Sequence, residues 1–388
     1  MKILYSFGMS LGGPGVGYAA QEQITAYHRL GCEVSVFAAS SRAVLPPEVS
    51  VRTTLQMGRL RLPLRLVGMD RGFAWHDRIV ERAIEKSDIQ FDVVHTWPAC
   101  SERTLRAARR AGALAVREAP NTHTDNAYSV VEREHERLGL PLSGSHARNP
   151  ARLQTELREY EAADLILAPS ELAIETFVAR GVPVSKLALK AYGFDPERFA
   201  MDPDRQRGEL VTFTFIGRCE PRKGLHLALE AWKKSGVAET TRFVILGEFA
   251  PGYRELLVSD LEHPNIEIRG FVPDLRPVYA ATDVLVLPSV EEGSSLVTYD
   301  AQGAGCALLV SRAAGARMTP GVEGLVHEPG DVETLAAHMR QLATDAETRA
   351  RMQRAAHRNA PTLTWDNATR ELLATFESFR RKQAASSG

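Results

Sequence analysis

The chain has 388 residues, of which 44% are hydrophobic and 24% are charged, and its formal net charge is −1. This length favours two domains with sizeable cores, and the balanced charge argues against a nucleic-acid-binding surface spread over the whole protein. No run approaches the roughly 18 apolar residues of a membrane span, and residues 1–5 are typical of a first strand rather than a signal peptide. The four cysteines are too widely spaced for a metal or disulfide scaffold, so we expect reduced thiols in a cytoplasmic protein.

The N-terminal stretch predicts a strand, a glycine-rich turn and a helix. An apolar run over residues 3–7 precedes Gly12 and Gly13, and an amphipathic helix and a second strand at 34–37 follow. This is a Rossmann-like opening, in which the two glycines let backbone approach a ligand, although an ordinary tight turn would also use them. Because no acidic residue ends the second strand, nicotinamide binding is not expected.

Residues 57–67 alternate basic and apolar side chains around Pro63. In an extended chain Arg59, Arg61 and Arg65 would share one side. The pattern predicts either a contact with an acceptor or a membrane surface, or a solvated edge strand whose arginines prevent edge pairing. The edge strand is the favoured interpretation.

Polar residues follow two apolar strands in the first half of the chain. His95 lies near the end of one strand, and the strand at 113–117 leads into a loop with His123 and Asp125. Loops at the carboxyl ends of parallel strands are where α/β proteins bind ligands. Residues 133–152 are charged and interrupted by glycine and proline, so we expect a mobile loop in which acceptor specificity could reside.

A second strand, loop and helix begin after a polar, proline-containing stretch at 201–208, which we interpret as a linker. The apolar strand at 211–216 is followed by Gly217, Arg218 and Lys223, and then by an amphipathic helix. Two cations between a strand end and a helix start are placed as ligands of an anion would be. A solvated basic turn is the alternative.

The most informative stretch is residues 283–311, where two buried-strand patterns flank a loop and a helix. This is one βαβ unit, and its loop carries Glu291 and Glu292. The helix N-terminus there offers free backbone N–H groups and a partial positive charge. Ser294 or Ser295 is expected to cap the helix, and an anion such as phosphate is expected to bind at this point.

This segment resembles the signature of the GT-B retaining glycosyltransferases of family 4. Their pattern is Glu, then Gly-Phe-Gly-Leu or similar, then a second Glu eight positions after the first. The first part is represented here by Glu292, Gly293, Ser294, Ser295 and Leu296. Asp300 stands where the second acid is expected. The departures are Ser294 and Ser295 for Phe-Gly, and Asp300 for Glu.

The resemblance covers nearly the whole chain, because residues 217–224 also match the family pattern of Gly-Arg, a short gap and Lys-Gly. It implies an α/β protein with the GT-B fold: two Rossmann-like domains facing each other across a cleft, and a C-terminal helix that crosses back to the first domain. We expect an acceptor-binding domain at 1–200, a nucleotide-sugar-binding domain at 208–364 and the crossover helix at 365–382. The tail Lys382–Gly388 is expected to be disordered.

The implied activity is transfer of a sugar, with retention, from a UDP- or GDP-sugar to a hydroxyl group of a polysaccharide, lipid-linked or small-molecule acceptor. Arg218 and Lys223 would hold the diphosphate as negative charge grows on it. Glu292 would hold donor sugar hydroxyls and steady the developing positive charge. His123 would lie by the donor sugar, with His95 as the competing candidate.

Other residues are expected to bind substrate. They are Gly12, Gly13, Asp125, Gly217, Val272, Gly293, Ser294, Ser295, Leu296 and Asp300. In the resembled family Val272 would lie near the nucleotide base, Asp125 could bind an acceptor hydroxyl, and Asp300 would hold the ribose. The expected mechanism is same-face attack, in which the leaving phosphate takes the acceptor's proton.

No Asp-x-Asp motif follows a suitable strand, so no metal or other cofactor is expected. The expected partners are a nucleotide sugar and a hydroxyl acceptor, without nucleic acid. The expected location is the cytoplasm. Peripheral contact with the inner face of the membrane is a further option. The alternatives are a non-catalytic nucleotide-sugar-binding protein, or a sugar-nucleotide hydrolase or epimerase on the same scaffold. The donor base, the sugar and the acceptor stay open.

Overall fold

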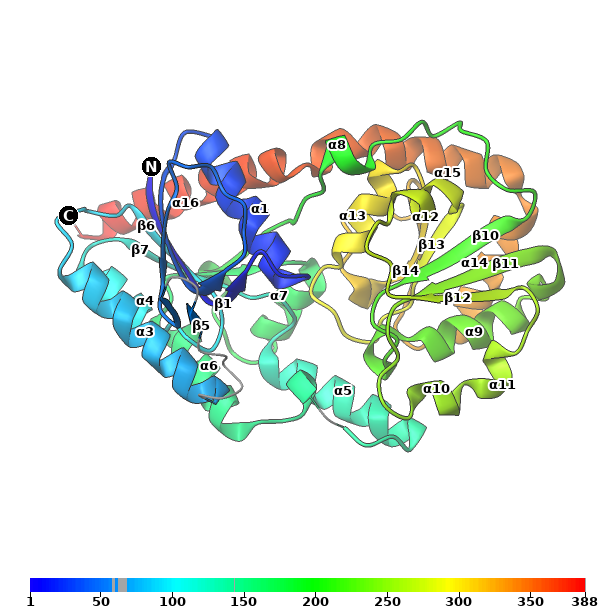
Figure 1. Ribbon diagram of the computed structural model, residues 1–388, viewed down its shortest axis with the longest axis horizontal. Helices are drawn as coiled ribbons and strands as arrows, with labels where there is room; N and C mark the ends of the chain where they lie inside the picture. The colour runs from blue at the N-terminus through cyan, green and yellow to red at the C-terminus, as the bar shows by residue number, and fades with distance from the viewer. Residues whose placement is uncertain (58–59, 62–67, 143, 388) are drawn as a thin grey trace. The chain divides into compact units, whose positions relative to one another are not determined.

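The computed structural model describes residues 1–57, 60–61, 68–142 and 144–387. The chain divides into two compact units (Figure 1). Unit 1 comprises Met1–Thr124, Arg148–Lys190 and Trp365–Gly388, and unit 2 comprises Asp125–Ala147 and Ala191–Thr364. The last helix therefore returns to the unit that holds the N-terminus, as expected for the GT-B fold, whereas residues 125–147 group with unit 2.

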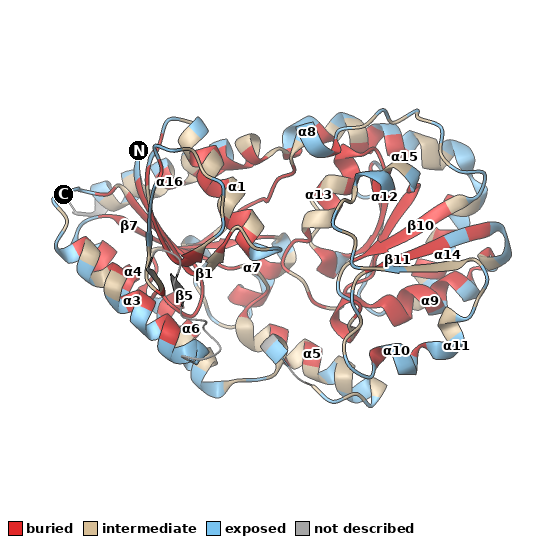
Figure 2. Cartoon of the chain, in the orientation of Figure 1, coloured by how far each residue is buried: buried red, intermediate tan, exposed pale blue. Residues whose placement is uncertain are grey.

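Unit 1 is built on a parallel sheet that has seven strands within the described part of the chain. In order across the sheet these are β3 (Ser50–Thr53), β2 (Glu33–Ser41), β1 (Lys2–Leu11), β6 (Val93–Thr96), β7 (Leu114–Glu118), β8 (Leu165–Ala168) and β9 (Leu187–Leu189). The central strands are buried on both faces, as in parallel sheets that helices cover on both sides (Figure 2).

The strand β1 shows how the sequence pattern produces two cores. Tyr5 and Phe7 pack with Tyr27 of α1 on one face of the sheet, and Leu4 packs with Val80 of α3 on the other. This follows from the two-residue period of a strand. The helices of unit 1 are α1 (Val16–Arg29), α3 (Met69–Glu85), α4 (Glu102–Arg110), α6 (Pro150–Ala162), α7 (Glu171–Val178) and α16 (Trp365–Ser387).

The C-terminal helix α16 belongs to the core of unit 1. Its Leu372 and Phe376 are buried in the same cluster as Tyr5 and Tyr27. The helix continues to Ser387, so the expectation of a disordered tail over residues 382–388 is wrong for the described residues 382–387. Alanine and glutamine in the tail favour helix, and this extends α16 past its last core residues.

Unit 2 contains a second parallel sheet, with six strands among the described residues. In order across the sheet they are β12 (Ile266–Gly270), β11 (Thr241–Leu246), β10 (Val211–Ile216), β13 (Val284–Leu287), β14 (Ala307–Ser311) and β15 (Gly324–His327). Its helices are α5 (Thr124–Leu138), α8 (Pro196–Phe199), α9 (Leu225–Lys234), α10 (Tyr253–Leu256), α11 (Val258–Leu261), α12 (Arg276–Ala281), α13 (Leu296–Gly303), α14 (Val332–Thr344) and α15 (Ala346–Asn359).

Short elements complete the described structure. The 3₁₀ turns are η1 (Gly144–His146), η2 (Val184–Lys186), η3 (Pro221–Lys223), η4 (Ala238–Thr240), η5 (Arg312–Ala314) and η6 (Ala360–Leu363). An antiparallel pair joins β4 (Gln56–Met57) and β5 (Leu60–Arg61). Residues 58–59 and 62–67, and with them most of the predicted basic-apolar strand, lie outside the described residues.

The expectation of a loop over residues 133–152 is wrong at both ends. The helix α5 runs to Leu138, and α6 begins at Pro150, where Asn149 caps it by accepting a hydrogen bond from Arg152 N at 3.0 Å. Asp125 likewise lies in the first turn of α5 rather than in a loop. The helix α5 is mostly polar, and only Ala127, Tyr128 and Val131 of it are buried, so its apolar periodicity is too weak to predict a helix from the sequence.

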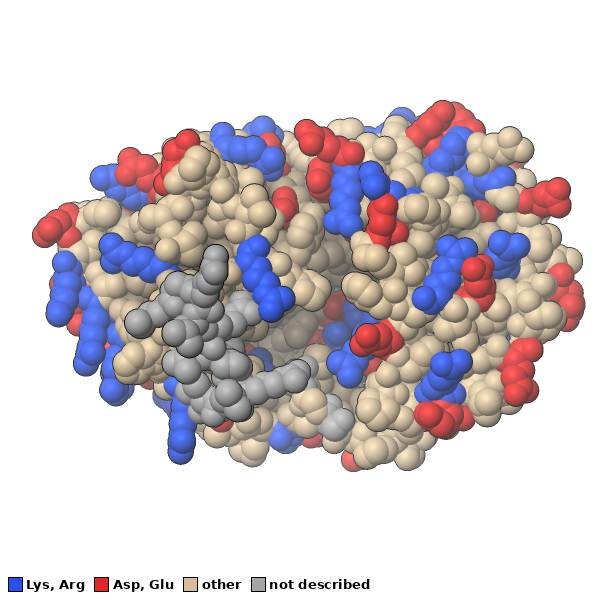
Figure 3. Space-filling model, viewed as in Figure 1, with Lys and Arg blue, Asp and Glu red and all other residues tan. Residues whose placement is uncertain are grey.

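The surface agrees with the balanced composition. Basic and acidic side chains are interspersed over the face shown in Figure 3. Among the described helices, none combines the length and apolar character needed to span a membrane. All four cysteines are buried and none forms a disulfide.

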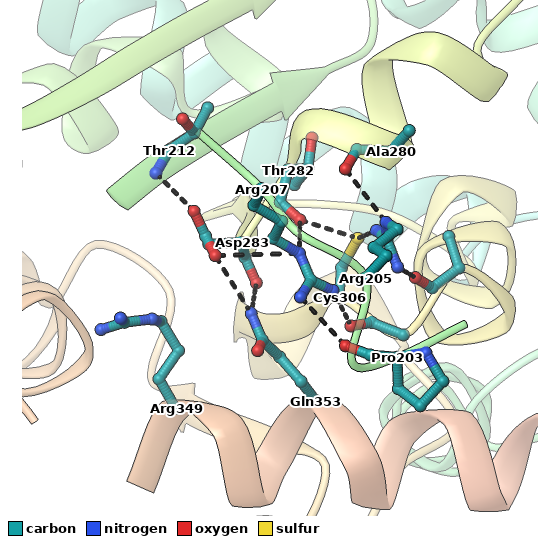
Figure 4. Close-up of polar contacts among 12 residues, drawn as sticks. Pro203, Arg205, Arg207, Thr212, Ala280, Thr282, Asp283, Cys306, Arg349 and Gln353 are labelled. Atoms are coloured by element: carbon teal, nitrogen blue, oxygen red, sulfur yellow. Dashed lines mark hydrogen bonds and ion pairs between the residues drawn. The ribbon is translucent and has the colours of Figure 1, made fainter. Parts of the chain in front are cut away.

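The predicted linker at 201–208 is fastened along unit 2 by two arginines (Figure 4). Arg205 donates hydrogen bonds to the carbonyl oxygens of Tyr279, Ala280 and Ala304, at 2.6, 3.0 and 2.5 Å. Arg207 donates to the carbonyl oxygens of Thr282 and Gly305, at 3.1 and 2.8 Å. The guanidinium groups thus satisfy backbone acceptors at helix ends and strand starts, so this segment is part of unit 2.

We expect Arg205→Met to lower the free energy of unfolding by roughly 2–4 kcal/mol, because partly buried carbonyl groups lose their donors. The matched control is Arg354→Met, whose guanidinium is 46% exposed and pairs with Asp204 at 3.5 Å. An exposed pair of this kind contributes less than about 1 kcal/mol. Urea unfolding of the two variants measures the difference, and equal losses would contradict the role of Arg205.

Candidate functional site

The candidate site lies at the carboxyl edge of the unit 2 sheet. Because all strands of this sheet are parallel, the segments that follow them emerge at one edge. The residues predicted to bind donor are on these segments: Gly217, Arg218 and Lys223 after β10, Val272 after β12, and Glu292, Gly293, Ser294, Ser295 and Leu296 after β13. The structure therefore brings the second-half predictions together on one side of unit 2.

Glycines allow these segments to touch through backbone atoms. A Cβ on Gly247 would lie 1.8 Å from the carbonyl oxygen of Gly217, and one on Gly224 would lie 2.1 Å from that of Pro288. A Cβ on Gly315 would lie 2.1 Å from the carbonyl oxygen of Gly293. No side chain fits at these distances, so three glycines fix how closely the loops of neighbouring strands approach.

A cluster of charges joins the segment after β10 to the segment after β13. Lys223 forms an ion pair with Glu292 through Nζ and Oε2. Arg222 contacts Glu220 Oε1 at 3.0 Å, Glu291 Oε2 at 3.3 Å and Glu292 Oε1 at 3.6 Å. Arg222 Nη1 also donates to the carbonyl oxygen of Glu291 at 3.1 Å. We call these five side chains the charge cluster.

Burial sets the electrostatics of the charge cluster. The pKa of Lys223 is lowered to about 7, first by burial and then by repulsion from Arg222. The carboxylates of Glu220 and Glu291 act in the opposite direction but do not outweigh these two effects. Burial alone would raise the pKa of Glu220, but Arg222 outweighs it and the pKa is lowered. Arg218 differs from the cluster because its side chain is 64% exposed. Its ion pair is a longer contact, with Nε 3.5 Å from Glu220 Oε2. Arg218 is therefore accessible to a ligand.

Ser294 is engaged in the structure rather than capping the helix. Its Oγ lies 2.7 Å from the carbonyl oxygen of Gly315, to which it donates, and 2.9 Å from the hydroxyl of Tyr299. Ser295 is the N-cap residue of α13, but its side chain makes no capping hydrogen bond, so the prediction of a serine cap is wrong. Its backbone N–H donates instead to the carbonyl oxygen of Ala314 at 3.0 Å. The first turn of α13 still directs backbone N–H groups toward this edge.

Asp300 lies in the second turn of α13. Burial raises the pKa of its carboxyl group to about 8; Arg198 opposes this shift and Asp195 adds to it. The group is therefore mostly protonated near neutral pH. A protonated carboxyl group can both donate and accept hydrogen bonds, which suits contact with hydroxyl groups.

Two features border the candidate site. Phe271, next to Val272 at the end of β12, is 72% exposed and offers a flat apolar surface. On the other side a hollow of about 80 Å³ is lined by Arg218 and Glu220 and by Leu140 and His146. The segment that follows α5 thus lies against the segment after β10 within unit 2.

The remaining predicted residues lie elsewhere. His123, Gly12 and Gly13 belong to unit 1, and Asp125 belongs to α5 in unit 2. His123 is 2% exposed, its backbone N–H donates to Thr176 Oγ1 at 3.0 Å, and its ring packs on Tyr160 and Phe177.

The two glycines of the first loop differ in their surroundings. A Cβ on Gly12 would lie 2.5 Å from the backbone nitrogen of Ala43, whereas one on Gly13 would come no closer than 3.6 Å to a neighbour. Packing against the end of β2 therefore explains Gly12, and Gly13 keeps an open side.

His95, the competing candidate, is enclosed in unit 1. It is fully buried between the hydroxyl of Tyr27 and Glu118 Oε2, each at 3.0 Å, and Glu118 contacts Lys190 Nζ at 2.7 Å. Burial opposes the ionisation of Glu118, yet Lys190 and then His95 bring its pKa down to about 2. Both ring nitrogens of His95 thus have hydrogen-bond partners, and His95 is a residue of the core.

The described residues contain no group of three or more His, Cys, Asp or Glu placed to hold a metal ion. The edge itself presents cations, a carboxylate and the backbone N–H groups of the first turn of α13.

Comparison with protein families agrees with this arrangement. Residues 14–198 match the model described as "Glycosyltransferase Family 4", and residues 211–345 match "Glycosyl transferases group 1". The chain belongs to the family 4 glycosyltransferases. The enzyme is 25% identical to the D-inositol 3-phosphate glycosyltransferase of Kribbella flavida, over 92% of this chain and 88% of the relative. It is 27% identical to the O-antigen chain mannosyltransferase B of Escherichia coli over 42% and 45% of the two chains.

Solved structures show that the enzyme has the GT-B fold. A sucrose-phosphate synthase from Thermosynechococcus elongatus matches with a TM-score of 0.71 and 16% identity, over 99% of this chain and 100% of that one. The Anabaena protein HepE, solved in complex with UDP and with UDP-glucose, matches with a TM-score of 0.67 and 18% identity, over 97% and 100% of the two chains.

Two residues of the enzyme's charge cluster, Glu220 and Arg222, were missed by sequence reasoning. Arg222 was passed over because the family pattern specifies only the arginine and lysine at the ends of its segment. The signal that could have found it is the pair Glu291–Glu292, since two adjacent acids directly after a buried strand require more than one cation nearby.

The enzyme should tolerate Gly236→Ala much better than Gly224→Ala. Both glycines have left-handed backbone, with φ of 76° and 73°, but only Gly224 has a backbone oxygen in the space that a Cβ would take. The conformation alone costs about 1–2 kcal/mol, and the clash at Gly224 adds roughly 1–3 kcal/mol. Thermal unfolding of both variants measures this, and equal shifts would refute the packing argument.

Asp300 gives the enzyme a pH-dependent stability. The unfolded chain ionises this carboxyl group above its ordinary pKa of 3.8, while the folded chain holds the proton up to about pH 8. The unfolded state therefore binds fewer protons in this window, and stability falls as pH rises from about 4 to 8. Asp300→Asn should match wild type near pH 4 and exceed it by about 1–3 kcal/mol at pH 8.

Urea unfolding at several pH values tests this prediction. Asp204→Asn is the control, because Asp204 is 68% exposed and pairs only weakly with Arg354. A difference between Asp300→Asn and wild type that does not change with pH would show that Asp300 is ionised in the folded enzyme.

Proposed function

We propose that the enzyme transfers a sugar, with retention at the anomeric carbon, from a nucleoside diphosphate sugar to a hydroxyl acceptor. The observation that carries the proposal is the carboxyl edge of unit 2, where exposed Arg218, buried Lys223 and the first turn of α13 all lie on the segments that follow the neighbouring strands β10 and β13. A diphosphate leaving group gains negative charge during transfer, and these groups are positioned to stabilise it.

The ion pair of Lys223 with Glu292 would be exchanged for contacts with the donor when the donor binds. Without donor, each charge neutralises the other. A diphosphate would attract the Lys223 ammonium, and Glu292 would then be free to bind sugar hydroxyls. Arg222 contacts Glu292 at 3.6 Å and would hold the carboxylate in place during this exchange. The more negative the leaving phosphate becomes, the more Lys223 favours it over Glu292.

Same-face attack fits these residues better than a covalent intermediate. A nucleophilic carboxylate must be free to bond to the sugar, whereas Glu292 is held by two cations and Glu291 is buried against Arg222. The leaving phosphate would take the acceptor's proton. No metal ion is required in this proposal, because Arg218 and Lys223 supply the positive charge that a metal would otherwise bring.

The donor is proposed to be a UDP- or GDP-sugar, and UDP is the first choice because HepE binds UDP and UDP-glucose. Phe271 is placed beside Val272 to cover one face of the base, and Asp300 is the proposed ligand of the ribose hydroxyls. Hydroxyl groups of polysaccharides, lipid-linked sugars and small glycosides all fit as acceptors.

A thermal-shift panel of UDP-, GDP- and ADP-sugars in EDTA tests the proposal, since a bound ligand raises apparent stability by mass action. One donor class should raise the melting temperature, and that donor should then be consumed with an acceptor, giving the donor's anomeric configuration by NMR. Consumption without an acceptor would instead indicate a hydrolase. Binding without turnover would indicate a non-catalytic protein, and loss of transfer in EDTA would contradict metal independence.

Arg218→Ala should lower kcat by roughly 10²–10³-fold, as removal of one preorganised donor to a developing anion does in other enzymes. The control is Arg242→Ala, since Arg242 is also exposed but lies at the amino end of β11. Its kcat should stay within about twofold of wild type. Equal effects of the two substitutions would remove Arg218 from the proposed site.

A further inference from the structure

The helix α3 of unit 1 carries a row of exposed cations along its outer face. Its inner face is buried in the core of the unit, through residues such as Val80 and Ile84. Side chains three or four positions apart lie on the same face of a helix. On the opposite side this spacing aligns the exposed side chains of Arg71, Trp75, Arg78, Arg82 and Lys86. We call these residues the basic row, which extends over about 22 Å of the helix.

The acidic side chains of α3 are engaged by other partners. Glu81 and Glu85 pair with arginines of the neighbouring helix α4, with Arg103 Nη1 at 3.5 Å and Arg110 Nη2 at 2.8 Å. Asp77 is buried, and its carboxylate accepts a hydrogen bond from the backbone nitrogen of Arg103 at 2.9 Å. The two glutamates thus neutralise cations of α4 rather than those of the basic row.

The cations of the basic row are unpaired. Within the described part of the chain, no ion pair or side-chain hydrogen bond is made by Arg71, Arg78, Arg82 or Lys86. The exposed acids nearest in sequence, Asp70 and Asp88, flank the row at its two ends. A single exposed cation is simply solvated, but four aligned on one face create a positive field at one place on the surface.

Trp75 adds an aromatic surface to the basic row. It is 49% exposed, whereas the other three tryptophans of the chain are buried. Its indole N–H donates to the carbonyl oxygen of Thr54 at 3.1 Å, so the ring is held in place beside the arginines. Met69 and Ile89, at the two ends of the helix, are exposed as well. Tryptophan among basic side chains is typical of protein surfaces that lie at the headgroup level of a membrane.

The basic row is on the outside of unit 1. Figure 3 shows basic side chains gathered along the edge of this unit where α3 and α4 lie in Figure 1. The loops that carry Gly13 and His123 follow β1 and β7, whereas the row belongs to the helix that precedes β6. The basic row therefore shares no residue with the predicted acceptor-binding loops.

We propose that the basic row docks the enzyme on an anionic phospholipid surface. Lipid phosphates would neutralise the four unpaired cations, and Trp75 would enter the headgroup layer beside them. Each lysine or arginine held near such a surface strengthens binding by about fivefold. The inner face of α3 is used by the core, so the helix would lie on the bilayer rather than insert its apolar side.

A nucleic acid also carries phosphates, but it fits this surface less well. Met69, Trp75 and Ile89 would stay in water beside a phosphodiester backbone, whereas the headgroup layer of a membrane takes up exposed apolar side chains of this kind. Docking on a membrane is independent of the reaction that the enzyme catalyses.

Sedimentation of the full chain with phosphatidylcholine vesicles, with and without phosphatidylglycerol, tests the docking. The variant is Arg78→Gln/Arg82→Gln/Lys86→Gln. The charge-matched control removes three exposed arginines from β11, α15 and α16, as Arg242→Gln/Arg358→Gln/Arg381→Gln. Circular dichroism should show wild-type folding of the variant, because its substituted side chains make no ion pair among the described residues. If the triple variant does not fold, Arg82→Gln/Lys86→Gln takes its place.

Trp75 supplies a second readout. Because the other tryptophans are buried, a shift of the emission to shorter wavelength on vesicle binding should come from Trp75 as it enters the headgroup layer. The substitution Trp75→Phe should abolish that shift.

The expected result is binding that requires phosphatidylglycerol and that weakens by roughly 10²-fold in the triple variant but by less than about threefold in the control. Equal weakening in variant and control, or no binding to either kind of vesicle, overturns the proposal. Bound protein without a shift of the Trp75 emission overturns it too, because another surface would then meet the lipid. Binding of polyuridylate in place of the vesicles would assign the row to a nucleic acid and would likewise overturn it.

Discussion

The arrangement of the candidate active site depends on Arg222. Its guanidinium contacts Glu220 on its own segment and both Glu291 and Glu292 on the segment after β13, and its carbonyl oxygen accepts a hydrogen bond from Val290 N at 2.9 Å. A buried ion cluster contributes little net stability, because desolvation offsets the attraction, but removal of one member leaves a charge unpaired. The contribution of Arg222 is therefore positional: it holds two acids in place, of which Glu292 is the one proposed to bind the donor.

Backbone contacts make that positioning rigid. Gly224 lies against Pro288, and Gly315 lies against Gly293, so the segments after β10, β13 and β14 touch without intervening side chains. The backbone that carries these charges therefore has little room to move when a ligand arrives, although a side chain such as that of Lys223 can exchange its partner. Preorganisation of this kind is what makes electrostatic stabilisation effective, since no reorganisation accompanies the reaction. Arg218 lies outside this frame, and its exposed guanidinium is the proposed accessible ligand of the diphosphate.

The sequence predicted the fold and most of this edge, because both rest on local patterns. Apolar runs predicted the parallel strands, and the spacing of Gly217, Arg218 and Lys223 identified the candidate anion ligands that lie at this edge. It could not predict contacts that depend on tertiary distance. Arg222 gains its role from acids about 70 positions away, and Gly12 is explained by the backbone of Ala43. The helical state of residues 133–138 and 383–387 was missed because polar sequences carry weak periodicity, and packing or propensity then decides.

The departures from the family pattern have a physical explanation in the same structure. Where the pattern has phenylalanine, Ser294 donates to the carbonyl oxygen of Gly315 and lies within hydrogen-bond distance of Tyr299. The Tyr299 hydroxyl in turn accepts from Tyr192 N at 3.3 Å. Because Ser294 donates to Gly315, Tyr299 must donate to Ser294. Each polar group in this series of hydrogen bonds therefore has a partner. Hydrogen bonds thus replace aromatic packing behind the donor loop. A decayed site would leave such buried groups unpaired, so the pairing argues for a substitution that preserves the loop rather than for loss of activity.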